Sequence, residues 1–140
     1  MTAQEYLEGI ERQRLRIAEV SAKLDALYKD INFLPGVSYD GIKVQISTTD
    51  NRILSMIEEA EDRRKVLVEM IAEYQIDKEA REAVIGRLAD DRLAALLTMR
   101  YVAGRYWWEI SDELGVSMRT AFRLHAEALE EMERIMGGEK

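Results

Sequence analysis

The side chains best suited to chemistry stand close together in the C-terminal third of the chain, between positions 117 and 123. Two arginines and a threonine in this stretch can contact phosphate oxygens and base edges, so the combination predicts binding to double-stranded DNA. The candidate DNA-binding residues are Ser117, Met118, Arg119, Thr120, Phe122 and Arg123.

The sequence offers few residues suited to a catalytic or metal site. The sequence has no cysteine, which excludes disulfides and thiol catalysis, and its one histidine, His125, favours a surface or packing role over zinc binding. The neighbouring carboxylates of Asp90 and Asp91 would point to different faces of a helix, which is poor geometry for catalysis. We therefore expect no catalytic residue, no metal, no cofactor and no enzymatic activity.

Two predicted helices position the candidate residues. The first covers Trp107–Leu114, Gly115 supplies the turn, and Ser117 caps a second helix that runs to residue 129. This spacing is typical of a helix-turn-helix, whose second helix enters the major groove by its N-terminal end. Ser111 is small where the two helices would cross. The helix-turn-helix pattern places Trp108 near the core and Trp107 at the start of the first helix. The inward-facing residues are expected to be Ile110, Leu114, Val116, Ala121 and Leu124.

Two long helices precede this segment. From Tyr6 to Leu34 apolar residues recur every three or four positions for four heptads, interrupted only by Gln13. Pro35 and Gly36 should end that helix and open a linker near residues 35–49, in which residues 42–46 could form a short strand.

A second apolar stripe begins after Thr48 or Thr49, either of which suits an N-cap. It has the same spacing and loosens around residues 75–78, where we expect a shorter helix to follow. The two stripes could pair within one chain as an antiparallel hairpin or between two chains. One more helix, residues 91–102, should be capped by Asp90 or Asp91 and end at Gly104.

These patterns predict an all-α fold, with long coiled-coil-like helices followed by a small helical domain. The expected domains are residues 1–88, a helix-turn-helix domain at residues 89–136 and a flexible tail at residues 137–140. Neither a leader nor an apolar run of membrane-spanning length is present, so we expect a cytoplasmic protein with no membrane contact.

The C-terminal part of the sequence resembles known transcription proteins. Residues 93–129 are similar to the promoter-reading C-terminal domain of bacterial sigma factors. The whole chain resembles phage-encoded regulators of the ArpU and RinA group, and the resemblance implies DNA binding by the six candidate residues. It is carried by Met99-Arg100-Tyr101-Val102, Trp108-Glu109-Ile110-Ser111 and Arg119-Thr120-Ala121-Phe122-Arg123-Leu124-His125.

The net charge of the chain bears on which functions are possible. The chain has a formal net charge of −7, which argues against general polyanion binding, and residues 98–126 carry four arginines against three carboxylates. The leading hypothesis is a sequence-specific transcription regulator of phage or prophage type that forms a homodimer through its long helices. The alternatives are a sigma-like module that docks on RNA polymerase or a phage packaging component, and a structural coiled-coil adaptor.

Overall fold

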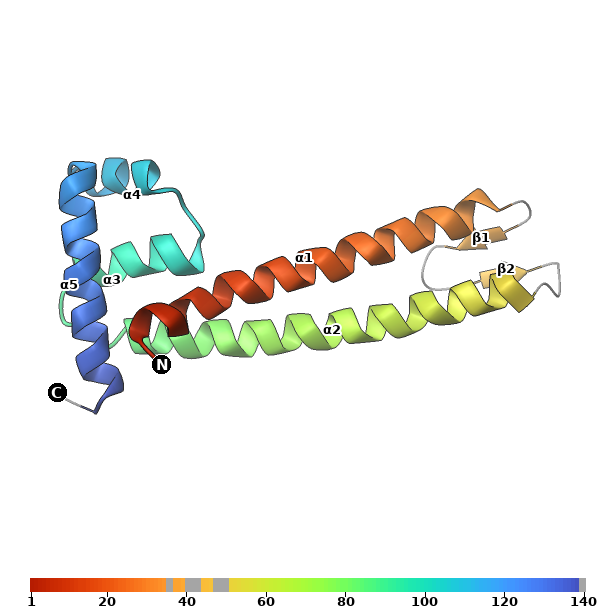
Figure 1. Cartoon of the computed structure of the whole chain (residues 1–140), viewed down its shortest axis with the longest axis horizontal. Coiled ribbons are helices and arrows are strands. Elements are labelled where there is room, and N and C mark those ends of the chain that lie inside the picture. Colours follow the sequence, from red (N-terminus) through yellow and green to blue (C-terminus); the bar gives the residue numbers. More distant parts are fainter. Residues whose placement is uncertain (35–36, 40–43, 47–50, 139–140) are drawn as a thin grey trace. The chain divides into compact units, whose positions relative to one another are not determined.

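The computed structural model of the chain describes residues 1–34, 37–39, 44–46 and 51–138 (Figure 1). The predicted all-α fold is confirmed, and the described residues also form a ribbon of two three-residue strands. The expected helix stop at Pro35 and Gly36, the cap at Thr48 or Thr49 and the end of the tail lie outside the described residues. The elements are α1 (Ala3–Phe33), β1 (Val37–Tyr39), β2 (Val44–Ile46), α2 (Asn51–Ile85), α3 (Asp91–Leu97), η1 (Thr98–Val102), α4 (Trp107–Leu114) and α5 (Met118–Met136).

The chain folds as two compact units. Unit 1 combines Met1–Arg14 with Tyr74–Lys140, and unit 2 is Leu15–Glu73. The compact units divide both long helices, whereas the domain boundary expected near residue 88 follows the end of α2 at Ile85. The first turns of α1 and the last turns of α2 therefore belong with the C-terminal helices.

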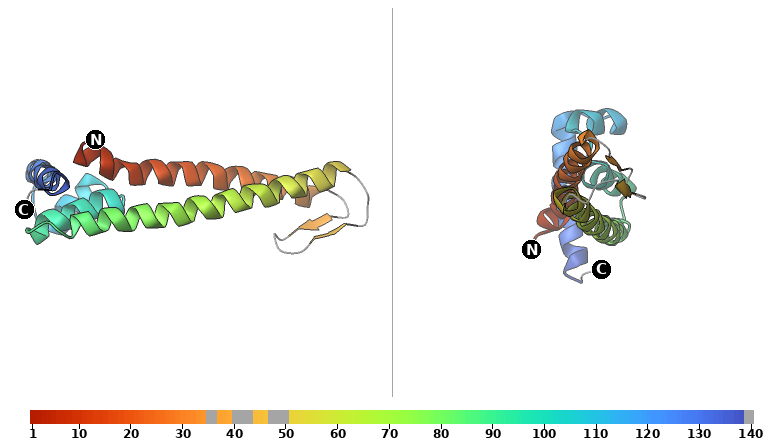
Figure 2. Two further views of the ribbon diagram at one scale, coloured as in Figure 1. Left: turned by 90° about the horizontal axis from the view of Figure 1, so that it is seen from below. Right: turned by 90° about the vertical axis from the view of Figure 1, so that its right-hand side faces the viewer.

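In unit 2, α1 and α2 pack against each other within one chain, which answers the question that their matched stripes left open. Figure 1 and the left view of Figure 2 show these segments side by side. Leu24 and Ile31 from α1 are buried with Ile53 and Ala60 from α2. Beyond them β1 and β2 pair antiparallel, with Val37 opposite Ile46, so the expected strand has a partner.

In unit 1, polar contacts join the ends of the same two helices. The Gln13 amide that interrupts the apolar stripe donates a hydrogen bond of 2.6 Å to the Asp77 carboxylate, and the Arg14 guanidinium donates one of 2.9 Å to the Tyr74 hydroxyl. These polar partners loosen the apolar pattern around residues 75–78 without ending the helix. The prediction of a separate shorter helix there was wrong, and α2 continues to Ile85.

The core of unit 1 draws on every helix in it. Leu96 and Leu97 from α3, Ile110 from α4 and Met132 from α5 are fully buried together. Ala3 and Leu7 of α1 and Ile85 of α2 complete the same cluster. Burying such apolar side chains contributes roughly 1.5–3 kcal/mol each, so the start of α1 helps to hold the C-terminal helices in place.

The helix predicted over residues 91–102 has two parts. Asp90 caps α3 as expected, since its carboxylate accepts hydrogen bonds from the backbone N–H groups of Arg92 and Leu93. After Leu97 the backbone widens into the π-helical turn η1, closed by a 2.9 Å hydrogen bond from the Ala103 N–H to the Thr98 carbonyl. The chain then turns at Gly104, whose φ of 68° is left-handed as predicted.

Candidate nucleic-acid interface

The turn between α4 and α5 has the local structure that the sequence predicts. Gly115 ends α4 with φ 68° and ψ 34°, a conformation that costs glycine little. Its N–H donates to the Asp112 carbonyl, and the N–H of Val116 donates to the Ser111 carbonyl. This pair of bonds is the Schellman arrangement, which satisfies the last carbonyls of α4 and sets the direction of the chain into α5.

Gly115 gives a test of this turn. A Cβ added there would meet nothing within 4 Å, so only the left-handed backbone opposes a side chain. We expect Gly115→Ala to lower the free energy of unfolding by about 1–2 kcal/mol and Gly115→Asn to lower it by less, because asparagine tolerates this conformation. Urea denaturation of both variants measures the difference. Equal losses for alanine and asparagine would contradict the account.

Ser117 begins α5 as its N-cap. Its hydroxyl oxygen accepts a hydrogen bond of 3.1 Å from the Thr120 backbone N–H, and its hydroxyl proton is donated to the Thr120 side-chain oxygen at 3.0 Å. Both hydroxyls are therefore engaged in holding the first turn. In this arrangement Ser117 and Thr120 position the helix, and their side chains have a structural task besides any contact with a ligand.

The other four candidate residues share the solvent-exposed face of the first two turns of α5. Met118 is 41% exposed and Phe122 is 47% exposed, while Ala121 and Leu124 on the opposite face are buried. The Arg119 and Arg123 side chains also lie on the exposed face.

The two arginines form at most a weak ion pair within the described part of the protein. Arg123 approaches Glu127 at 4.0 Å, with 69% of the arginine side chain exposed, and such a pair is worth little in water. Within the described ranges, Arg119 makes no ion pair. Both guanidinium groups can therefore be offered to an anionic partner.

The position predicted for Trp108, near the core, was wrong, while Trp107 stands at the start of α4 as predicted. Trp108 is 63% exposed, whereas Trp107 packs partly buried against the core of unit 1. Residues 107, 110, 111 and 114 fall at the spacing of one helical face, and the buried Ile110 and Ser111 mark that face as the inner one. Trp107 also lies edge-on to Phe122, with ring centroids 5.1 Å apart.

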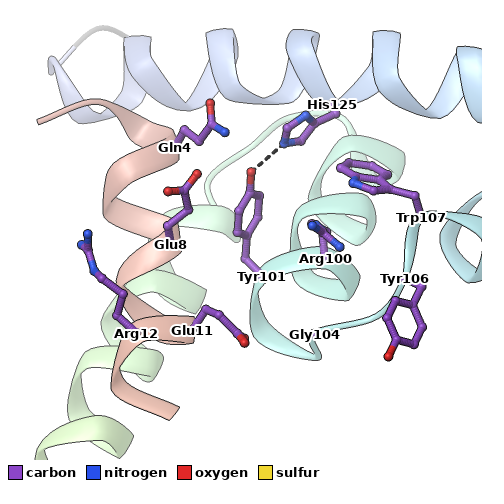
Figure 3. Close-up of a pocket in the computed structure, with 10 residues that line it drawn as sticks. All are labelled: Gln4, Glu8, Glu11, Arg12, Arg100, Tyr101, Gly104, Tyr106, Trp107 and His125. Carbon is purple, nitrogen blue, oxygen red and sulfur yellow. Dashed lines mark hydrogen bonds between the residues drawn. The ribbon is translucent and has the colours of Figure 1, made fainter. Parts of the chain in front are cut away.

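Unit 1 also contains a pocket of about 640 Å³, which the sequence did not predict (Figure 3). Its wall includes His125, whose Nε2 is 2.6 Å from the Tyr101 hydroxyl, and Trp107, whose ring centroid is 4.8 Å from that of His125. Tyr101 and His125 are 24 positions apart, so no local sequence pattern predicts their contact. The pocket is lined by Gln4, Glu8, Glu11, Arg12, Arg100, Tyr101, Gly104, Tyr106, Trp107 and His125.

Burial shifts both partners of this hydrogen bond toward their neutral forms. It raises the pKa of Tyr101 to about 12, an effect that the Glu8 charge strengthens and Arg100 opposes. It lowers the pKa of His125 below 6.5, assisted by Arg100 and opposed by Glu8. Near neutral pH both groups are therefore uncharged, and the hydrogen bond joins a neutral phenol to a neutral imidazole.

The lowered pKa of His125 makes the stability of the fold depend on pH. The unfolded chain takes up this proton near pH 6.5 while the folded chain resists it, so the free energy of unfolding falls as the pH drops below about 6.5. Urea midpoints of the wild type and His125→Gln, measured from about pH 7.5 to pH 5, should converge as the pH falls. Parallel curves would show that His125 does not titrate differently in the fold.

Among the residues that the structure describes, no helix combines the length and apolar character needed to cross a membrane. The same residues bring together no group of three His, Cys, Asp or Glu side chains able to hold a metal ion.

Comparison with known proteins gives one match. The model of a family described as "Protein of unknown function (DUF1492)" matches residues 37–133, a range that includes α2 and the whole α4–α5 turn. Neither a curated protein nor a solved structure matches the chain. Since the matched range covers most of the sequence, the chain belongs to the DUF1492 family.

Proposed function

We propose that this protein is a sequence-specific DNA-binding transcription regulator of phage or prophage type, and that the start of α5 reads the major groove. The observation that carries the proposal is the exposed face of the first two turns of α5. It presents Arg119 and Arg123 beyond a capped N-terminus, on a helix whose opposite face is fixed in the core. The resemblance to sigma-type recognition helices supports the same assignment.

The chemistry of this face suits DNA. An arginine can donate two parallel hydrogen bonds to the O6 and N7 atoms of guanine, or it can neutralise a phosphate. The exposed Met118 and Phe122 offer apolar contacts beside the two guanidinium groups. The positive end of the α5 dipole adds a favourable interaction with the DNA backbone.

The charge balance favours a dimer as the binding species. With a net charge of −7 on the chain, one copy of this face supplies little attraction to phosphate. Two copies on half-sites about 34–36 Å apart would double the contact set. Exposed apolar side chains along α1 and α2 of unit 2 can supply a homodimer contact: Leu15, Leu54, Val66, Val68 and Ile71.

Selection of bound sequences from a random duplex library tests the proposal. We expect enrichment of one motif with two related half-sites, and light scattering of the complex should give two chains per duplex. A library that remains unenriched through repeated rounds would reject sequence-specific binding.

A second function is favoured by one observation, the exposure of Trp108 and Phe122 on neighbouring helices. Exposed aromatic side chains of this kind are enriched at protein interfaces, and a sigma-like module docking on RNA polymerase or a phage packaging component would use them. That function predicts capture of purified RNA polymerase, or of a packaging component, together with no sequence preference on DNA. Loss of capture in Trp108→Ala would identify the surface.

A further inference from the structure

The pocket of unit 1 has the size and composition of a small-molecule site. Its volume of about 640 Å³ falls within the range of roughly 300–1,000 Å³ that is usual for such sites. Its inner wall is aromatic, formed by the buried Tyr101 and the partly buried Trp107 and His125. Flat apolar groups bind well to walls of this kind.

One side of the pocket carries negative charge. Glu8 and Glu11 both come from α1, and Figure 3 shows Glu11 extending toward η1 while Arg12 extends to the other side of α1. Glu11 is paired with Arg14 at 3.3 Å. The Glu8 carboxylate accepts no hydrogen bond from the described residues, yet its charge acts on both Tyr101 and His125.

The facing side carries a guanidinium group with donors to spare. Arg100 lies over the Trp107 ring, 5.0 Å from its centroid, and one of its terminal nitrogens donates to the Arg105 carbonyl at 3.1 Å. Over the described part of the chain, no carboxylate lies within ion-pairing distance of Arg100. Glu8 and Arg100 thus line one pocket with opposite charges that are not paired with each other.

A ligand that matches both walls must carry both charges. We propose that this pocket binds a small zwitterion with a flat apolar body, the chemistry of an aromatic α-amino acid. Its ammonium group is held at Glu8, its carboxylate at Arg100, and its ring lies against Tyr101 and Trp107. The proposal concerns the pocket alone and stands whether or not α5 binds DNA.

Three related compounds test the proposal by titration calorimetry on the full chain near neutral pH. L-phenylalanine carries both charges, phenethylamine lacks the carboxylate, and 3-phenylpropionate lacks the ammonium group. Because a hydrogen bond to a charged group is worth about 1.5–3 kcal/mol, we expect each analogue to bind at least about tenfold more weakly than L-phenylalanine. No binding of any compound, or equal affinities for all three, would overturn the proposal.

Variants of the two charged walls locate the ligand. Glu8→Gln should weaken L-phenylalanine about tenfold without weakening 3-phenylpropionate, while Arg100→Gln should weaken L-phenylalanine without weakening phenethylamine. Glu8 is exposed and makes no hydrogen bond in the described structure, so its variant keeps the fold. Glu130→Gln removes the same charge from α5 outside the pocket and is the control. Equal weakening by Glu8→Gln and Glu130→Gln would refute a site at Glu8.

Discussion

Replacing Arg119 and Arg123 together with alanine is expected to weaken binding to the selected duplex by about 100-fold or more. Each arginine that contacts a base or a phosphate contributes roughly 1–3 kcal/mol, and both stand exposed on the same face of α5. Fluorescence anisotropy at several salt concentrations measures the loss. The slope of log affinity against log salt should also fall, by about 0.9 for each phosphate contact removed.

A charge-matched variant separates contact from general electrostatics. Arg16→Ala with Arg63→Ala removes two positive charges from the long helices, where Arg16 is exposed and Arg63 is paired with Glu59 at 2.8 Å. We expect this control to keep affinity within about threefold of the wild type, because neither arginine belongs to the proposed DNA-reading face of α5. Equal losses in the two double variants would show that α5 has no special role.

The second large effect concerns stability. Leu96 is fully buried in the core of unit 1, and its truncation to alanine removes packed methyl groups and leaves a cavity. We expect Leu96→Ala to lower the free energy of unfolding by about 2–5 kcal/mol in urea denaturation. Ile76, which is 66% exposed, provides a similar truncation without the cavity, and Ile76→Ala should stay within about 0.5 kcal/mol of the wild type. Similar losses for both variants would contradict the assigned core.

Predictions from the sequence succeeded where the physical cause is local. The left-handed turn at Gly115 and the caps at Asp90 and Ser117 depend on residues within a few positions of each other. The same holds for the long helices, whose stripes of apolar residues repeat over many turns. The apolar stripe did not indicate which helix each long helix packs against, because the same spacing fits an antiparallel hairpin within one chain and a dimer of two chains equally well.

The errors arose where contacts distant in sequence decide the outcome. Gln13 and Asp77 replace an apolar contact by a hydrogen bond across 64 positions, so the apolar pattern loosens although the helix continues. The widened turn η1 leaves no signal in residue type. The helix-turn-helix pattern predicts Trp108 near the core. The spacing from the buried Ile110 instead favours Trp107, which shares its helical face, and this is what the structure has.

The pocket was missed for a related reason. Its walls come from α1, η1, α4 and α5, and the start of α1 was assigned to a coiled coil rather than to the C-terminal core. Only once Ala3 and Leu7 are placed in that core do Glu8 and Arg100 line one site. The six candidate DNA-binding residues, by contrast, lie in one short segment, and sequence periodicity could place them.

Backbone amide NMR shifts of the isotope-labelled chain, recorded while the selected duplex is added, test the central proposal most directly. The account predicts that the largest changes fall on residues 117–123, and that a scrambled duplex of equal length produces smaller changes at the same positions. Changes confined to the long helices, or equal changes with both duplexes, would contradict the assignment of α5 as the DNA-reading helix.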